Sequence, residues 1–279
     1  MKNCTVNTTS RPFTFPTAWP DVYKRQVLWC LLLLGDLSVT AFFALAIVPF
    51  VVEVAGPLVA EFRHGGTPWH ADHIAERYGL LAIITLGEGV IGTVAAMSAY
   101  VNGPGPGWTS DAIVLLSAGT ALTFGMWWVY FAMPWGELLS THRERSFFWG
   151  YGHMLVYGSI AAVGAGLHAV QYFIEHHTKL TATETLLTVA VPTAVFIGIV
   201  YVMYAVCMRV FDAFHVVLLA ITAVVLGASV VAVAAGWSVP AGLVLVALAP
   251  VVTVVGYETI GYRHGADHIE RLRATARPR

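Results

Sequence analysis

The stretch Leu80-Leu-Ala-Ile-Ile-Thr-Leu-Gly-Glu88-Gly-Val-Ile-Gly92 decides the fold, because it is apolar except for one carboxylate. No other charged residue lies between Arg77 and Asp111. A helix of about 20 apolar residues crosses the ~30 Å hydrocarbon core of a bilayer. A carboxylate at that depth is costly and requires a partner, a proton or a water-filled cavity. The stretch therefore predicts a membrane-spanning helix with a polar group near its middle.

The composition argues against a soluble domain. Hydrophobic residues make up 57% of the 279 residues and charged residues 11%, whereas soluble domains carry about 25% charged residues. We therefore expect a lipid bilayer around most of the chain, with no nucleic-acid partner at a net charge of −1 and no cofactor. The cysteines, Cys4, Cys30 and Cys207, have neither the number of a disulfide framework nor the spacing of a metal site.

We predict an all-α fold, a polytopic transmembrane helix bundle over residues 27–262 with about seven spanning helices. Helix-breaking residues such as Gly103-Pro-Gly-Pro-Gly107 fall between the apolar runs. Pro49 and Pro192 fall inside runs, where membrane helices tolerate kinks. The predicted spans are 27–54, 77–100, 112–133, 148–174, 186–208, 213–235 and 239–260.

Lysine and arginine are unevenly distributed between the two sides of these spans. One side has ten, and the other has Lys179 alone, or five when Lys2, Arg11, Lys24 and Arg25 are counted. Because cytoplasmic loops carry the excess, we expect the side with ten, including a basic tail at 263–279, to be cytoplasmic. The ten are Arg63, Arg77, Arg143, Arg145, Arg209, Arg263, Arg271, Arg273, Arg277 and Arg279.

Residues 1–26 do not fit this orientation. They are polar, rich in proline and threonine, and lack the apolar core of a signal peptide. Lys24-Arg25 adjoins the first predicted span on the side that the other loops place outside. We expect this segment to be disordered or foreign sequence that makes no contact with the bundle.

The second predicted span has a polar face. His73, Glu76 and Arg77 open it at i, i+3, i+4 spacing, and Glu88 falls within about 20° of Arg77 around the helix. Gly92, one turn beyond Glu88, allows a neighbouring helix to approach closely. We therefore expect Glu88 to face the bundle and not lipid.

The fourth predicted span is the expected neighbour, because Gly158, Ala162 and Gly166 form a ridge of small residues. It carries His153 near its cytoplasmic end and His168 near its outer end.

Arg77 is too far from Glu88 for a salt bridge, about 16 Å along the axis. Glu88 should therefore be protonated or hydrogen-bonded to another helix, with His153 or Asp36, an acid inside the first predicted span, as candidates.

Each of these groups also has a structural interpretation. Glu88 is either a protonated packing group or part of a proton or ion pathway. His153 and His168 are either satisfied core histidines or relay members. Glu76 and Arg77 suit an interfacial pair or a helix-end anchor.

No other pattern predicts chemistry. His70-x-x-His73 and His176-His177 lack the partners of a metal site, so we predict no metal. The chain has no Walker loop, Gly-x-Ser-x-Gly or HExxH motif, and we predict that it is not an enzyme. An aromatic cluster around one loop suits an interface belt better than a ligand cage. Its members are Trp127, Trp128, Tyr130, Phe147, Phe148 and Trp149.

Four segments resemble the bacterial low temperature requirement A (LtrA) family of membrane proteins. The most specific runs from His73-Ile-Ala-Glu-Arg77 to Leu86-Gly-Glu88, similar to the family's His-x-x-Glu-Arg…Leu-Gly-Glu signature. The others are Val52-Glu53-Val-Ala-Gly-Pro57, Met126-Trp-Trp-Val-Tyr-Phe131, and Tyr151-Gly-His153 followed by Ala162-Val-Gly-Ala-Gly166. The resemblance implies a multi-pass protein of the bacterial inner membrane and adds Glu53 to the candidate polar residues.

Two departures from the family accompany the resemblance. The Glu-Leu-Phe-aromatic-Asp-Leu pattern of the family's first span is absent, so we expect an N-terminally truncated chain. The family often has an acidic residue where His168 stands. The resemblance implies no reaction, ligand or cofactor.

Two functions stay open. One is a transporter or channel-like protein whose buried acids and histidines handle protons or small ions. The other is a structural or stress-related membrane protein in which those groups only fix helix packing.

Overall fold

The computed structural model describes residues 19–64, 69–102, 107–208 and 213–261, and within these ranges every regular element is a helix. The chain divides into two compact units. We call residues 1–68 the hairpin unit and residues 69–279 the bundle unit, and each is described by itself. The predicted all-α fold is confirmed, and seven helices in the described part of the chain are long and apolar enough to cross a membrane.

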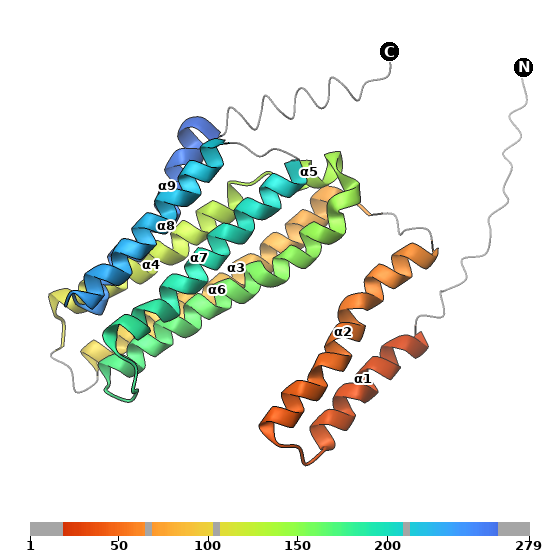
Figure 1. Cartoon of the computed structure of the whole chain (residues 1–279), viewed down its shortest axis with the longest axis horizontal. Coiled ribbons are helices and arrows are strands. Elements are labelled where there is room, and N and C mark those ends of the chain that lie inside the picture. Colours follow the sequence, from red (N-terminus) through yellow and green to blue (C-terminus); the bar gives the residue numbers. More distant parts are fainter. Residues whose placement is uncertain (1–18, 65–68, 103–106, 209–212, 262–279) are drawn as a thin grey trace, which may run out of the picture. The chain divides into compact units, whose positions relative to one another are not determined.

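The hairpin unit consists of two antiparallel helices, α1 (Trp19–Leu34) and α2 (Val39–His64) (Figure 1). The predicted first span, 27–54, is therefore wrong, since the chain turns at residues 35–38. Gly35 has poor helix propensity, and the Ser38 hydroxyl accepts a hydrogen bond from the Ala41 N–H at 3.3 Å, which starts α2. The candidate span in this unit is Val39–Val59.

Two further predictions for this unit are wrong. Asp36 lies in the turn and not inside a helix. Residues 19–26, which we expected to be disordered or foreign, begin α1, while residues 1–18 lie outside the described residues.

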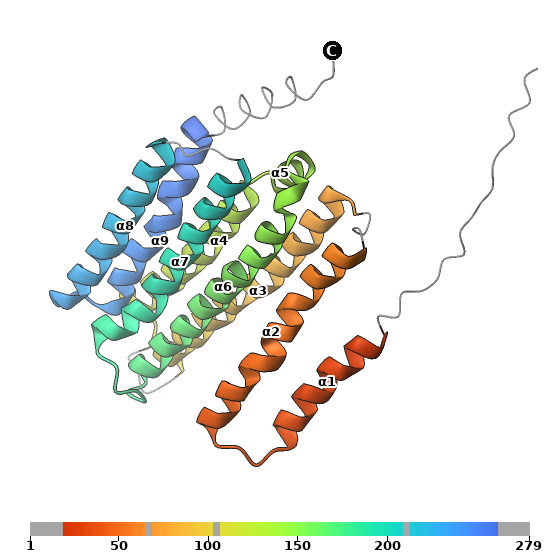
Figure 2. The ribbon, with the colours of Figure 1, turned by 45° about the vertical axis from the view of Figure 1, so that its right-hand side comes forward.

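The bundle unit contains six long helices that lie side by side in two views (Figures 1 and 2). The short helix α5 and the 3-10 turn η1 join α4 to α6, and a π-helical turn η2 follows α9. The bounds are α3 Ala71–Val101, α4 Ser110–Phe131, α5 Trp135–Thr141, η1 Arg143–Arg145, α6 Ser146–Ile174, α7 Ala182–Met208, α8 Ala213–Ala234, α9 Val239–Gly256 and η2 Tyr257–Gly261.

Local sequence explains where these helices begin and end. The Thr109 and Ser238 hydroxyls cap α4 and α9 by accepting hydrogen bonds from backbone N–H groups at 3.3 and 3.4 Å. Gly236 turns the chain between α8 and α9 with a φ of +103°, which favours glycine. Pro134 precedes α5.

Small residues let the helices of the bundle unit approach closely. A Cβ added to Gly92 of α3 would lie 2.6 Å from the carbonyl oxygen of Gly164 of α6. A Cβ on Gly125 of α4 would lie 2.8 Å from Cγ of Pro250 of α9. Such backbone contact is typical of membrane helices, which cannot use a hydrophobic driving force against lipid.

The prediction that the second and fourth predicted spans are neighbours is confirmed, since they correspond to α3 and α6. The predicted ridge is wrong as the contact, because a Cβ on Gly158 would meet no atom within 4 Å and Gly166 contacts Thr188 of α7.

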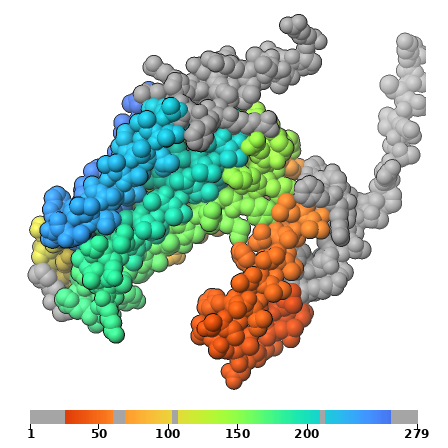
Figure 3. Space-filling model, viewed as in Figure 1, coloured from red at the N-terminus to blue at the C-terminus, as the bar shows by residue number. Residues whose placement is uncertain are grey.

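The two ends of the bundle unit differ in their content of arginine and lysine. Helices α3 and α6 begin, and α4, α7 and α9 end, at the end that holds α5, which we call the α5 end (Figure 1). Arg77, Arg143 and Arg145 lie there, and Lys179 lies in the α6–α7 connection at the opposite end. One face of this unit, formed by α6, α7 and α8, is seen in space-filling form in Figure 3.

Candidate functional site

Glu88 occupies the middle of α3. It follows the start of the helix by about 26 Å and precedes its end by about 20 Å at 1.5 Å per residue. The helix is long and apolar enough to span a bilayer. The carboxylate therefore lies in the depth range where burying a charge is most costly.

The backbone of Glu88 packs against α6, but its side chain is exposed. A Cβ added to Gly164 would lie 2.7 Å from the Glu88 Cβ and 2.9 Å from its carbonyl oxygen. The residue is nevertheless exposed, so the expectation that it faces the bundle is wrong in this structure. Gly92, 40° farther around the helix, takes the contact with α6 that we had expected to cover the carboxylate.

His153 does not reach the Glu88 carboxylate, because both of its ring nitrogens have other partners. Within the described part of the bundle unit, Glu88 makes no hydrogen bond or ion pair. The other predicted partner, Asp36, belongs to the hairpin unit.

His153 is completely buried and both of its ring nitrogens are used. Nδ1 lies 2.8 Å from the carbonyl oxygen of Trp149, and Nε2 lies 2.9 Å from the hydroxyl of Tyr130. Since a carbonyl only accepts, Nδ1 carries the proton, and in the neutral ring Nε2 accepts from the tyrosine. This arrangement is that of a satisfied core histidine, one of the two interpretations left open by the sequence.

Aromatic rings enclose His153 near the α5 end. The rings of Trp149, Tyr78 and Tyr157 have centroids 4.1, 4.8 and 5.5 Å from that of His153. The Tyr157 hydroxyl donates to the Tyr78 carbonyl at 2.9 Å, which ties α6 to α3. We call these residues, with Tyr130 and Trp135, the histidine box.

The histidine box revises the aromatic belt that we predicted. Tyr130 and Trp149 are fully buried, so they do not belong to a belt, whereas Trp127, Trp128 and Phe148 are exposed, as a belt requires. The Trp149 Nε1 atom is buried without a hydrogen-bond partner among the described residues.

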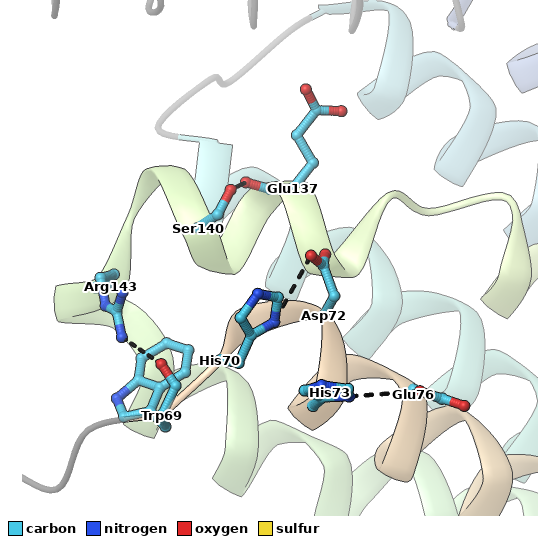
Figure 4. Close-up of polar contacts among 8 residues, drawn as sticks. All are labelled: Trp69, His70, Asp72, His73, Glu76, Glu137, Ser140 and Arg143. Carbon is cyan, nitrogen blue, oxygen red and sulfur yellow. Dashed lines mark hydrogen bonds and ion pairs between the residues drawn. The ribbon is translucent and has the colours of Figure 1, made fainter.

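His73 and Glu76 form an exposed pair at the start of α3. His73 Nδ1 lies 3.9 Å from a Glu76 carboxylate oxygen, and both side chains are more than two-thirds exposed (Figure 4). Arg77 is exposed and forms no ion pair among the described residues. These residues therefore lie at the helix end and do not join Glu88 or His153.

A second set of contacts fixes the same end of α3 to the α5–η1 segment. His70 Nδ1 lies 3.8 Å from an Asp72 carboxylate oxygen. The Arg143 guanidinium donates to the Trp69 carbonyl at 2.7 Å and lies 4.3 Å from the centre of the Trp69 ring (Figure 4). This geometry suits a helix-end anchor.

The remaining candidates lie on other helices and have partners of their own. His168 Nδ1 is 3.4 Å from the side-chain oxygen of Gln171, on its own helix. In the hairpin unit, the Trp29 indole N–H donates to the Glu53 carboxylate at 3.0 Å. Within the bundle unit the predicted constellation is therefore several separate sites, and no group of three or more His, Cys, Asp or Glu in the described part of the chain is arranged to hold a metal ion.

Sequence reasoning missed the tyrosines that complete the histidine box. Tyr130 and Tyr78 lie on other helices, 23 and 75 residues from His153 in sequence. The available signal was the Met126-Trp-Trp-Val-Tyr-Phe131 segment, since a tyrosine in an apolar helix needs a partner for its hydroxyl.

Comparison with known proteins identifies a family. No curated protein matches the chain, and no solved structure matches it. The family model described as bacterial low temperature requirement A protein (LtrA) matches residues 7–250, a range that includes part of the N-terminal segment that we had set apart. That range covers most of the chain and includes Glu88, His153 and the histidine box, so this protein belongs to the LtrA family.

Proposed function

We propose that this multi-pass membrane protein of the LtrA family moves protons or proton-coupled ions, with Glu88 as the group that binds and releases the proton. The observation that carries the proposal is an exposed carboxylate in the middle of a membrane-length helix, with no partner in the described part of the bundle unit. In hydrocarbon such a group is protonated, and it ionises only where water or a cation reaches it. A side chain that changes state with its surroundings is what a proton carrier needs.

The histidine box supports a different role for His153. Both ring nitrogens are already hydrogen-bonded inside a buried aromatic cluster. A relay member must exchange partners, and this histidine has no vacant nitrogen to do so. We therefore assign proton handling to Glu88 alone and packing to His153.

The test is proton flux in liposomes that contain the purified full-length chain and a pH-sensitive dye. Glu88→Gln keeps the size and hydrogen-bonding capacity of the side chain but cannot titrate, so it should abolish the flux. Glu76→Gln is the matched control, because it makes the same change on the same helix at an exposed end position. Flux that survives Glu88→Gln would contradict the proposal.

The second candidate function is a non-transporting structural protein. It is favoured by the satisfied state of His153 and by the separation of the predicted polar residues within the bundle unit. Infrared spectroscopy of the parent chain distinguishes the two. A Glu88 carboxyl that exchanges its proton between pH 5 and 8 supports the carrier, and one that stays protonated throughout supports the structural role.

We also propose that the α5 end faces the cytoplasm of a bacterial inner membrane. The support is the excess of arginine at that end over the single lysine at the other. In intact cells, a cysteine at Arg143 should resist a membrane-impermeant reagent, while a cysteine at Lys179 should react. The reverse pattern would overturn the orientation.

A further inference from the structure

We propose that His168 exchanges a proton with Glu88, and that Gln171 and Glu175 hold the His168 ring in the orientation that this exchange requires. The inference rests on the proposed function, in which Glu88 remains the only proton-binding group in the middle of the membrane. It adds a second group, nearer the α6–α7 connection, that links Glu88 to water.

Four side chains form a hydrogen-bonded row at the end of α6, which we call the polar row. The Gln171 Nε2 atom donates to one Glu175 carboxylate oxygen at 3.0 Å, and His177 Nδ1 lies 3.2 Å from the other. His168 Nδ1 lies 3.4 Å from the side-chain oxygen of Gln171. The polar row therefore runs from the half-buried His168 to His177, whose side chain is 70% exposed.

Local sequence builds the polar row. His168, Gln171 and Glu175 follow one another at i, i+3, i+7 spacing, so they share one side of α6. The helix then ends in a Schellman turn, in which the N–H groups of His176 and His177 donate to helix carbonyls at 3.2 and 2.8 Å. His176 adopts a φ of +57° there, a left-handed conformation that favours glycine. This turn brings His177 back to Glu175.

The polar row determines which nitrogen of His168 carries the proton. An ionised carboxylate only accepts, so the Gln171 amide directs its NH2 group to Glu175 and its oxygen to His168. The amide oxygen also only accepts, so His168 Nδ1 carries the proton. In the neutral ring Nε2 is then a base, and it has no partner in the part of the chain that the structure describes. His153 lacks such a vacant nitrogen.

No other carboxylate or lysine of the described residues near the α6–α7 connection joins the polar row. Glu184 accepts hydrogen bonds from the Thr181 N–H and hydroxyl at 2.8 and 2.9 Å, which caps α7. Asp111 lies at the start of α4, and Lys179 is exposed in the connection. The orientation of the Gln171 amide is therefore set by Glu175.

His168 is the ionisable residue of α6 closest in level to Glu88. A Cβ added to Gly164 would lie 2.7 Å from the Glu88 Cβ, and His168 follows Gly164 by one turn, about 6 Å along the axis and 40° around it. His153 precedes Gly164 by about 16 Å. Because a helical side chain covers the turn before its own Cα, His168 is directed back toward the turn that meets Glu88.

Glu88 and His168 make no hydrogen bond with each other in the structure, so transfer requires one of them to move. The exposed Glu88 side chain has no partner in the described part of the bundle unit, and such side chains change rotamer within nanoseconds. The Glu88 carboxyl O–H then passes its proton to His168 Nε2, which leaves a carboxylate and an imidazolium. The imidazolium releases the Nε2 proton to water, and uptake is the reverse.

Nitrogen NMR of isotope-labelled histidines tests the ring orientation without reference to transport. The full chain is placed in lipid nanodiscs, and His168→Gln identifies the signals of His168. Neutral His168 should carry its proton on Nδ1, and Gln171→Met should produce a mixture of both tautomers while His153 stays unchanged. His168 with its proton on Nε2 in the parent, or a spectrum that Gln171→Met leaves unaltered, would overturn the proposal.

Deuterium exchange of the Glu88 carboxyl proton, followed by infrared spectroscopy in liposomes, tests the transfer. His168→Gln keeps a polar side chain but removes the base, so exchange should slow by about 100-fold, the lower end of what a positioned acid or base contributes. His176→Gln is the matched control, because it makes the same change at an exposed position outside the polar row. Equal exchange rates in the two variants would count against the transfer.

Proton flux in the same liposomes separates this inference from the proposed function. Flux that His168→Gln leaves unchanged would reject the role of His168 and retain Glu88 as the carrier. A parent without flux, in which His168→Gln still slows exchange at Glu88, would reject transport and retain the transfer between the two residues.

Discussion

The middle of α3 and the histidine box each hold an ionisable side chain, Glu88 and His153, in opposite environments. His153 is fully buried, has a partner for each nitrogen and is surrounded by rings from four helices. Glu88 lies on an adjacent helix, exposed and without a partner among the described residues. A polar group inside a packed core contributes to stability when its hydrogen bonds are complete. A polar group left open on a membrane helix contributes little to packing and remains available for chemistry or association.

The largest effect on stability is expected from emptying the histidine box. His153→Ala removes a buried ring, leaves a cavity and leaves the Tyr130 hydroxyl without its hydrogen-bond partner. Together these should lower the free energy of unfolding by about 3 kcal/mol. Thermal unfolding of the full chain in detergent measures the change. A variant as stable as the parent would show that the box is not part of the core.

A smaller loss is expected from adding a methyl group where α3 meets α6. The Cβ of Gly164→Ala would press on the Cβ and backbone of Glu88 at 2.7–2.9 Å, and such overpacking costs about 1–3 kcal/mol. Gly158→Ala, on the same helix but with no atom within 4 Å, is the control and should keep the parent melting temperature. Equal effects of the two changes would mean that α3 and α6 do not touch at Gly164.

Removing one hydroxyl from the histidine box should lower the free energy of unfolding by less than Gly164→Ala does. Tyr130→Phe preserves the ring packing but leaves His153 Nε2 without its donor, a loss of about 1–2 kcal/mol. Tyr172→Phe, an exposed tyrosine of α6, serves as the control. If both variants have the same melting temperature, the Tyr130–His153 hydrogen bond does not stabilise the protein.

The smallest effect on stability is expected at Glu88. Glu88→Gln alters an exposed side chain with no partner among the described residues, so the free energy of unfolding should change by less than about 0.5 kcal/mol. A loss as large as that of Tyr130→Phe would show that Glu88 is a packing group after all and would erase the contrast with His153.

Hydropathy alone predicted most of the fold, because six of the seven spans are bounded by glycine, proline or charged residues. It failed at the hairpin, where Gly35-Asp-Leu-Ser38 interrupts two apolar runs that join into one long predicted span. The warning sign was the length of that span, 28 residues over 27–54, together with a serine that can cap a helix.

The candidate site was less predictable than the fold. Helical spacing placed Glu88 and Gly92 on nearly the same side of α3, yet a difference of 40° put one outside and the other in contact with α6. Spacing within one helix says nothing of which hydroxyl reaches a histidine, so Tyr130 was not paired with His153. Contacts between helices decide both points.

The contact between Gly92 and Gly164 also limits how a proton could travel. A Cβ added to Gly92 would lie 2.6 Å from the Gly164 carbonyl oxygen and 2.8 Å from the Leu167 Cβ, so the contact has no room for a column of water between α3 and α6. A proton that approached Glu88 through the interior would have to wait until these helices separated, a collective motion of microseconds or longer. Passage along the outer side of the seam needs no such opening. Proton transfer to Glu88 would then follow the outer surface of α3 and α6. Its rate would depend on whatever covers or uncovers that surface.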